Sequence, residues 1–259
     1  MDKNWAADFL GRLSASWHLL GVSLRRLLWS RQTIISAVLV VLAGVAAYAW
    51  ARDRQRQPSD FVEEVLLTVY VPFLLPILCL SYATAGIATD RDEQTLVYLV
   101  TSPLPRPFIF LAKAAAALVL SLAWTMGTLA LLAGIAGKPG LEVFRAVWPG
   151  LFWATVAYVC LFQVFSVAFR RATIYALGYA LFLETLIGNM PGIVKRLAIS
   201  FYARCLIFDA SAAFDVGPSG PFNELLFQPL PAATAYTILY AASAGLLLLG
   251  LVIFCTREY

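Results

Sequence analysis

The sequence predicts an all-α, polytopic membrane protein with six transmembrane helices, an amino-terminal amphipathic helix at the membrane interface and one short helix between the second and third spans. Hydrophobic residues form 61% of the chain and charged residues only 13%, against about 25% in a typical soluble domain. The apolar residues gather in blocks of about 20, which is the length that a helix needs to cross a bilayer. Most of the charges lie between these blocks, so the chain is expected to cross the membrane repeatedly.

The first 32 residues form an amphipathic pattern rather than a span. Apolar residues recur at steps of three and four, while Asp8, Arg12 and Arg26 fall on the opposite helical face. This pattern predicts an elbow helix over 1–32 that lies along the cytoplasmic membrane surface. The alternative is an ordinary helix packed against the bundle. The apolar face consists of Trp5, Phe9, Leu13, Trp17, Leu20, Leu24 and Leu27.

The remainder, residues 33–259, is expected to form one transmembrane domain. An even number of spans places both termini on the same side, and an excess of Lys and Arg there predicts that it is the cytoplasm. Arg170 and Arg171 lie in the short turn between the fourth and fifth spans, which should form a tight hairpin. A long outer loop is predicted at 191–231, with a surface-lying helix at 193–208. The spans are placed at 33–51, 65–88, 111–134, 147–168, 172–190 and 233–255.

Composition argues against several functions. His18 is the single histidine and the four cysteines form no CxxC pair, so no metal site is expected. The net charge of +4 comes from basic residues at helix ends, where they set topology, so nucleic acid is not expected as a partner. Gly137 and Lys138 are followed by Pro139, so the phosphate-binding pattern of an ATPase is absent and this chain is not expected to bind a cofactor.

The charged loop 89–107 between the second and third spans is the most informative segment. Its carboxylates precede a short apolar stretch, where they would stabilise the first turn of a helix, and prolines follow. Such a helix could receive force from a soluble partner, because its apolar residues would fill a groove while its charges orient docking. The alternative is a solvated loop. The predicted docking residues are Asp90, Arg91, Asp92, Glu93, Thr95, Leu96, Leu99, Pro103 and Arg106.

At these residues the sequence resembles the permease subunits of the ABC-2 type family of ATP-binding cassette transporters. In that family an acidic-Arg pair, Gly-Thr-Leu, a Pro element, an Arg and a downstream Lys follow the second span. Gln94 departs from the pattern because it stands where the family usually has Gly, and Asp90 stands where the family usually has Glu. The matching residues are Asp90 and Arg91, Thr95 and Leu96, Ser102 and Pro103, Arg106, and Lys113.

The resemblance implies an assembly and a function. It implies that 89–107 is a coupling helix and that a second permease chain, identical or paralogous, completes the translocation path in the plasma or inner membrane. Two copies of a cytoplasmic ATPase subunit would hold ATP and Mg²⁺, so this chain itself would not be an enzyme. Export of an unidentified substrate is the implied function. The alternative is a mechanotransmitting subunit that drives an extracytoplasmic protein without moving cargo.

Glu184 is the one acidic residue well inside a predicted span, where an ionisable group costs a few kcal/mol unless it is paired or hydrated. It could contact substrate, carry a proton or lock the span to a neighbouring helix. Alternatively, it lies near the outer interface and pairs with Lys195 or Arg196. An intramembrane enzyme that uses Glu184 is a weaker alternative, because acid/base chemistry would need a partner that the sequence does not reveal.

Overall fold

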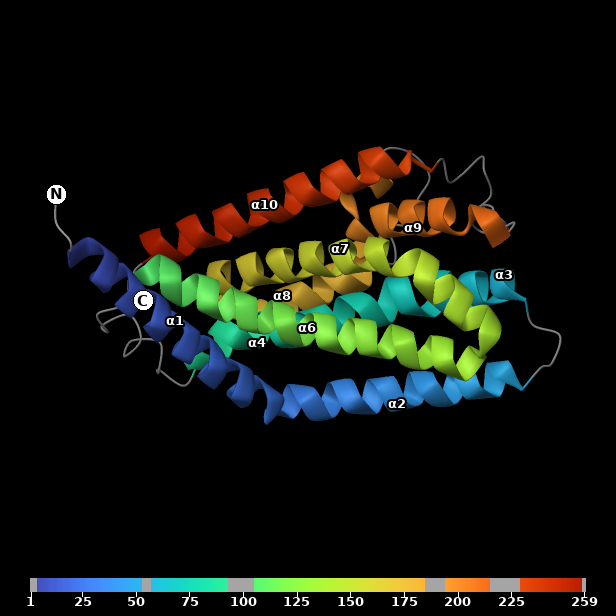
Figure 1. Ribbon diagram of the computed structural model, residues 1–259, viewed down its shortest axis with the longest axis horizontal. Coiled ribbons are helices and arrows are strands. Elements are labelled where there is room, and N and C mark those ends of the chain that lie inside the picture. The colour runs from blue at the N-terminus through green and yellow to red at the C-terminus, as the bar shows by residue number, and fades with distance from the viewer. Residues whose placement is uncertain (1–3, 53–56, 93–104, 185–193, 215–228, 258–259) are drawn as a thin grey trace.

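The computed structural model describes residues 4–52, 57–92, 105–184, 194–214 and 229–257 of the chain. Regular structure within these ranges is helical. Figure 1 shows long helices packed side by side along one axis, with α1 inclined to them. The helices are α1 (Asn4–Leu28), α2 (Arg31–Ala51), α3 (Pro58–Asp60), η1 (Phe61–Leu74), α4 (Leu75–Asp92), α6 (Arg106–Ala136), α7 (Lys138–Ala168), α8 (Ala172–Gly178), η2 (Tyr179–Glu184), η4 (Val194–Leu197), α9 (Ile199–Ala210), η5 (Ala212–Phe214) and α10 (Ala232–Thr256).

Within the described residues, five helical stretches are long and apolar enough to cross a membrane. Each contains one predicted span, so five of the predicted spans are confirmed by length and composition. The second stretch joins α3, η1 and α4 into one continuous helix that begins earlier than its predicted span. The five stretches are Arg31–Ala51, Pro58–Arg91, Arg106–Ala136, Lys138–Ala168 and Ala232–Thr256.

The predicted fifth span at 172–190 is not among these five. Its described part, α8 followed by η2, runs only from Ala172 to Glu184 and is too short to cross a hydrocarbon core of about 30 Å by itself. Residues 185–190 lie outside the described part of the chain. The predicted hairpin between α7 and α8 is present, because α7 ends at Ala168, α8 begins at Ala172 and the two helices are in contact.

The prediction of a surface-lying helix at 193–208 is wrong for residues 199–208, whereas Val194, Arg196 and Leu197 are exposed. All residues of α9 from Ile199 to Phe208 are buried, and α9 packs against α7, α10 and η1. Figure 1 shows α9 running alongside α7 rather than across the end of the bundle. Most side chains of α9 are apolar and occupy more than one face, and such a helix is stabilised by burial against several neighbours.

Helix α7 is the centre of the bundle and contacts α4, α6, α9 and α10. At Gly150 an added Cβ atom would lie 2.9 Å from the Cβ atom of Leu206, so only glycine allows α9 to approach α7 this closely. The turn from α6 into α7 also depends on a glycine, because Gly137 has a φ of 76°. Gly150 therefore sets how closely α9 packs on α7, and Gly137 shapes the turn that joins α6 to α7.

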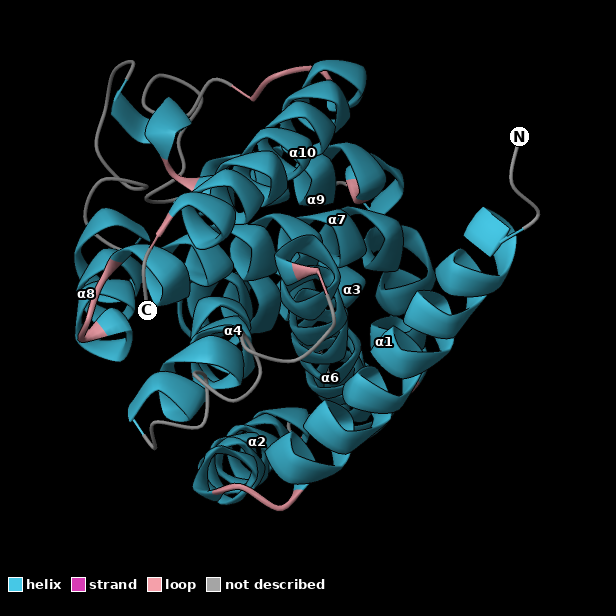
Figure 2. Ribbon diagram, turned by 90° about the vertical axis from the view of Figure 1, so that its left-hand side faces the viewer, coloured by secondary structure: helices cyan, strands magenta, loops and turns pink. Residues whose placement is uncertain are grey.

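The described end of α1 packs against the bundle. Leu20, Leu24 and Leu27 pack against α4 and α6 near Tyr82. The Trp17 side chain, in contrast, is 74% exposed. The side chains of the apolar face before Ser14 lie outside the described part of the chain. The end of α1 is therefore a packed helix of the bundle, and Figure 2 shows α1 running obliquely past helices that are seen nearly end-on.

Candidate functional site

One end of the bundle gathers the ends of several described helices, and we call it the basal end. There α1 joins α2, α4 ends at Asp92, α6 begins at Arg106, and α7 and α10 both end. The predicted docking segment joins α4 to α6 in the sequence, and its described flanks lie at this end. Of its predicted residues, Asp90, Arg91 and Arg106 are described. Glu93, Thr95, Leu96, Leu99, Pro103 and the side chain of Asp92 lie outside the described part.

The Asp90 carboxylate, 2% exposed, is the centre of a buried charge cluster. It forms ion pairs with Lys113 of α6 and with Arg26 of α1. The Lys113 ammonium is also buried and donates a hydrogen bond to the Gly86 carbonyl oxygen at 3.2 Å. Gly86 and Asp90 are four residues apart and therefore share the face of α4 that meets α6. The two ion pairs offset the free-energy cost of removing the Asp90 carboxylate from water.

Two arginines hold the carboxyl end of α7. Arg91 donates hydrogen bonds to the carbonyl oxygens of Ser166 at 3.2 Å and Arg170 at 2.8 Å. Arg257, directly after α10, donates to the carbonyl oxygen of Ala168 at 2.8 Å and to that of Val167. The last carbonyl groups of a helix have no partner within it and carry partial negative charge, so cationic side chains from other helices stabilise them.

Arg106 makes an equivalent contact with α10. Its guanidinium donates to the carbonyl oxygens of Cys255 at 3.1 Å and Arg257 at 3.4 Å. The chain entering the segment 93–104 is thus bonded to α1, α6 and the end of α7, and the chain leaving it is bonded to the end of α10. We call the six residues that make these bonds the basal anchors: Arg26, Asp90, Arg91, Arg106, Lys113 and Arg257.

Sequence reasoning selected three of the basal anchors as docking residues and did not select the other three. Lys113 was noted only as part of the family motif, and Arg26 only as part of the polar face of α1. A stronger signal was available for Lys113, because a lysine well inside an apolar stretch needs a buried counter-charge. No pattern in the sequence pointed to Arg257, since its partners are backbone carbonyl groups of a distant helix.

The second buried carboxylate, Glu184, lies at the end of η2 and is fully buried. Its Oε1 accepts a hydrogen bond from the Ile199 N–H at 3.1 Å, and its Oε2 accepts one from the Ser200 N–H at 2.9 Å. These are the first N–H groups of α9, where a negative charge is stabilising. These hydrogen bonds tie η2 to the start of α9, as expected of a residue that holds neighbouring helical segments together. Arg196, one of the partners considered from sequence, is exposed.

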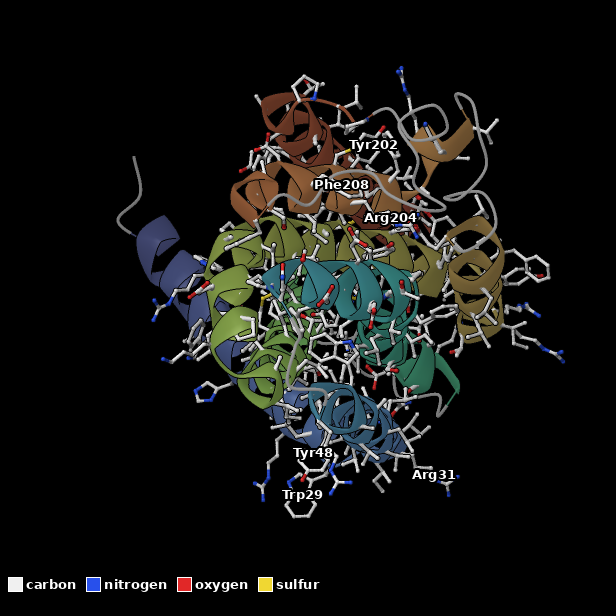
Figure 3. All side chains as sticks on the ribbon, turned by 90° about the vertical axis from the view of Figure 1, so that its right-hand side faces the viewer. Trp29, Arg31, Tyr48, Tyr202, Arg204 and Phe208 are labelled. Atoms are coloured by element: carbon white, nitrogen blue, oxygen red, sulfur yellow. The ribbon has the colours of Figure 1, made fainter. Side chains whose placement is uncertain are left out.

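Arg204 of α9 contributes to the surroundings of Glu184 and was missed by sequence reasoning, which placed it on a surface helix. Its side chain is 1% exposed and interacts electrostatically with Glu184. Figure 3 shows Arg204 on the side of α9 that faces the bundle. Tyr158 and Tyr179 also lie close to Glu184. Within the described ranges, no three His, Cys, Asp or Glu side chains gather as metal ligands would.

The fold and these two sites define a polytopic membrane protein whose buried charges tie its helices together. Residues 24–189, more than half of the chain, match a family model described as an ABC-2 family transporter protein. The chain therefore belongs to the ABC-2 transporter family and is a membrane permease of an ABC transporter. Membership implies a lipid bilayer and an ABC ATPase as partners. No curated protein matches the chain.

Proposed function

We propose that this permease couples ATP hydrolysis by a separate cytoplasmic ATPase to the export of an unidentified substrate. Two permease chains, identical or paralogous, would assemble with two ATPase subunits that hold ATP and Mg²⁺. The basal end and both termini face the cytoplasm, and 89–107 is the coupling helix that docks on the ATPase. The observation that carries this proposal is the bonding of both ends of the segment 93–104 to other helices through the basal anchors.

These bonds support force transmission because they join elements that would otherwise slide past each other. A push on the coupling helix reaches α4 and α6 directly through the chain. Arg91 and Arg106 extend the same push to the ends of α7 and α10, and Arg26 extends it to α1. Each hydrogen bond to a charged group contributes about 1.5 to 3 kcal/mol, so the contacts can bear a load while remaining reversible.

In this proposal, docking and transmission use different residues. Leu96 and Leu99 are the proposed contacts to the ATPase, whereas Arg91 donates hydrogen bonds to backbone carbonyl oxygens at the end of α7 and would transmit the push. We expect the double variant Leu96→Ala/Leu99→Ala to lose co-purification of the ATPase encoded with this chain. We expect Arg91→Met to retain the ATPase but to lose most of its stimulation of ATP turnover in lipid nanodiscs.

The matched control is Leu248→Ala/Leu249→Ala, which removes two exposed leucines from α10. This control should keep both binding and stimulation. Loss of binding in the control, or full binding and stimulation in the Leu96→Ala/Leu99→Ala variant, would contradict the placement of the coupling helix. Stimulation that rises with an added cargo supports export. Stimulation that depends only on an extracytoplasmic protein supports mechanotransmission instead.

A further inference from the structure

We propose that the basal end binds the headgroup of an anionic phospholipid in a cleft between α1, the start of α2, the end of α4 and α6. The cleft has a volume of about 780 Å³, within the range of small-molecule sites. Its lining includes Arg26, Arg31, Asp90 and Lys113. The inference concerns binding alone and does not depend on the proposed coupling to an ATPase.

The cleft lies where the chain enters the bilayer. Helix α1 ends at Leu28 and the first membrane-spanning stretch begins at Arg31, so Trp29 and Ser30 mark the transition. The Trp29 side chain is 88% exposed, and tryptophan side chains concentrate at membrane–water interfaces. Figure 3 shows Trp29 and Arg31 projecting from the same side of the bundle. The mouth of the cleft is therefore at the depth of lipid headgroups.

The charges of the cleft favour an anion. Arg26 and Lys113 share Asp90, which is the one carboxylate among the described residues of the lining, so the three cations of that described lining exceed its carboxylate by two positive charges. The Arg31 guanidinium has no hydrogen-bond or ion-pair partner among the described residues. A planar guanidinium matches the geometry of a phosphate group and can donate two parallel hydrogen bonds to it.

The start of α2 adds to this positive potential. Ser30 is the N-cap residue of α2, but its hydroxyl donates to the Leu27 carbonyl oxygen at 2.6 Å and makes no capping hydrogen bond to the helix. The N–H groups of an uncapped first turn attract anions. Arg31 and the N-terminus of α2 thus act on the same side of the cleft.

The remaining walls decide between a soluble anion and a lipid. Leu19, Val22, Leu27 and Ala85 supply apolar surface next to the charged mouth. Inorganic phosphate would leave this surface in contact with water. A phospholipid would cover it with its glycerol backbone and the first carbons of its acyl chains, which is favourable. The amphiphilic lining therefore fits a phospholipid.

The test measures lipid binding to the full chain purified in a neutral detergent. Native mass spectrometry follows a titration with phosphatidylglycerol, with phosphatidylcholine as the zwitterionic comparison. We expect preferential binding of phosphatidylglycerol, which Arg31→Gln weakens at least about fivefold because one phosphate-binding cation is lost. Arg171→Gln is the matched control, because Arg171 is an exposed arginine at the same end and does not line the cleft. It should leave binding unchanged.

A second variant tests the cleft without changing any charge. Ser23→Trp places a large side chain within the lining and should weaken phosphatidylglycerol binding as much as Arg31→Gln does. Unchanged binding in both cleft variants overturns the proposal. If Arg171→Gln weakens phosphatidylglycerol binding as much as Arg31→Gln does, binding depends on diffuse surface charge and the proposal is overturned. If inorganic phosphate alone competes with the lipid, the cleft is a soluble-anion site, which also overturns the proposal. Unfolding transitions recorded without lipid identify any variant that fails to fold, and the other variant then decides.

Discussion

Asp90 and Glu184 are both buried carboxylates, but their partners differ in kind. Asp90 is paired with the side chains of Arg26 and Lys113, which come from two other helices. Glu184 accepts hydrogen bonds from two backbone N–H groups at the start of α9 and also lies close to the side chains of Arg204, Tyr158 and Tyr179. Lysine and arginine side chains are long and can follow a moving carboxylate, whereas backbone groups move only with their helix.

This difference is one of access to water. The Arg26 side chain is partly exposed, so water can replace it when the basal end rearranges, whereas Lys113 is buried with Asp90. At Glu184 neither the carboxylate nor Arg204 has access to water. Breaking that contact would leave charged and polar groups unsatisfied in a low-dielectric interior. The Arg26 contact can therefore rearrange more easily than the Glu184 contact, which is suited to hold α9 in place.

The largest expected effect follows from Glu184→Ala. The variant leaves two buried N–H groups and the buried Arg204 without the carboxylate, a loss of about 3 to 5 kcal/mol. We expect the melting temperature in detergent to fall by about 10 °C. Glu184→Gln keeps one acceptor oxygen, so the melting temperature of this variant should fall by less. The control Glu142→Ala changes an exposed glutamate of α7 and should have no effect. If Glu184→Ala melts at the wild-type temperature, the Glu184 contact does not hold α9 in place.

A smaller effect is expected at the basal end. Asp90→Leu leaves Lys113 buried with no counter-ion and should destabilise the protein by about 3 kcal/mol. The double variant Asp90→Leu/Lys113→Met removes both charges and should recover more than half of that loss, because Arg26 can turn toward water. The same pair of variants should abolish stimulation of the ATPase. Additive losses of stability in the double variant would show that the two residues act independently.

Much of the architecture follows from the sequence, because a segment that crosses the hydrocarbon core of a bilayer must be apolar and must satisfy its own backbone hydrogen bonds. Blocks such as 38–45 on α2 must be helical and apolar to cross lipid, so five spans could be predicted that each fall inside an observed helical stretch, although three of these stretches begin five to nine residues earlier. The burial of α9 could not be placed in this way. The position of α9 depends on the close approach that Gly150 permits and on hydrogen bonds between segments separated in sequence.

The candidate site was predictable only in part for a similar reason. Asp90, Arg91 and Arg106 stand in a recognisable motif, but the motif does not say that they bond to this chain's own helices. Arg91 and Arg257 contact backbone carbonyl groups of α7, which every residue type provides, so no sequence pattern marks the recipients. Charge content indicated where the site lies, and only the fold shows which helices it joins.

The smallest expected effect separates stability from transmission at the basal end. Arg106→Met removes two hydrogen bonds to the carboxyl end of α10 at a partly exposed position, so stability should fall by only about 1 kcal/mol. ATPase binding should persist, while stimulation should fall several-fold because α10 no longer follows the coupling segment. Arg171→Met removes an exposed cation from the same end and should change neither property. If Arg106→Met behaves like Arg171→Met in ATP turnover, the contact with α10 is a local helix cap, and transmission must run through Asp90 and Arg91 alone.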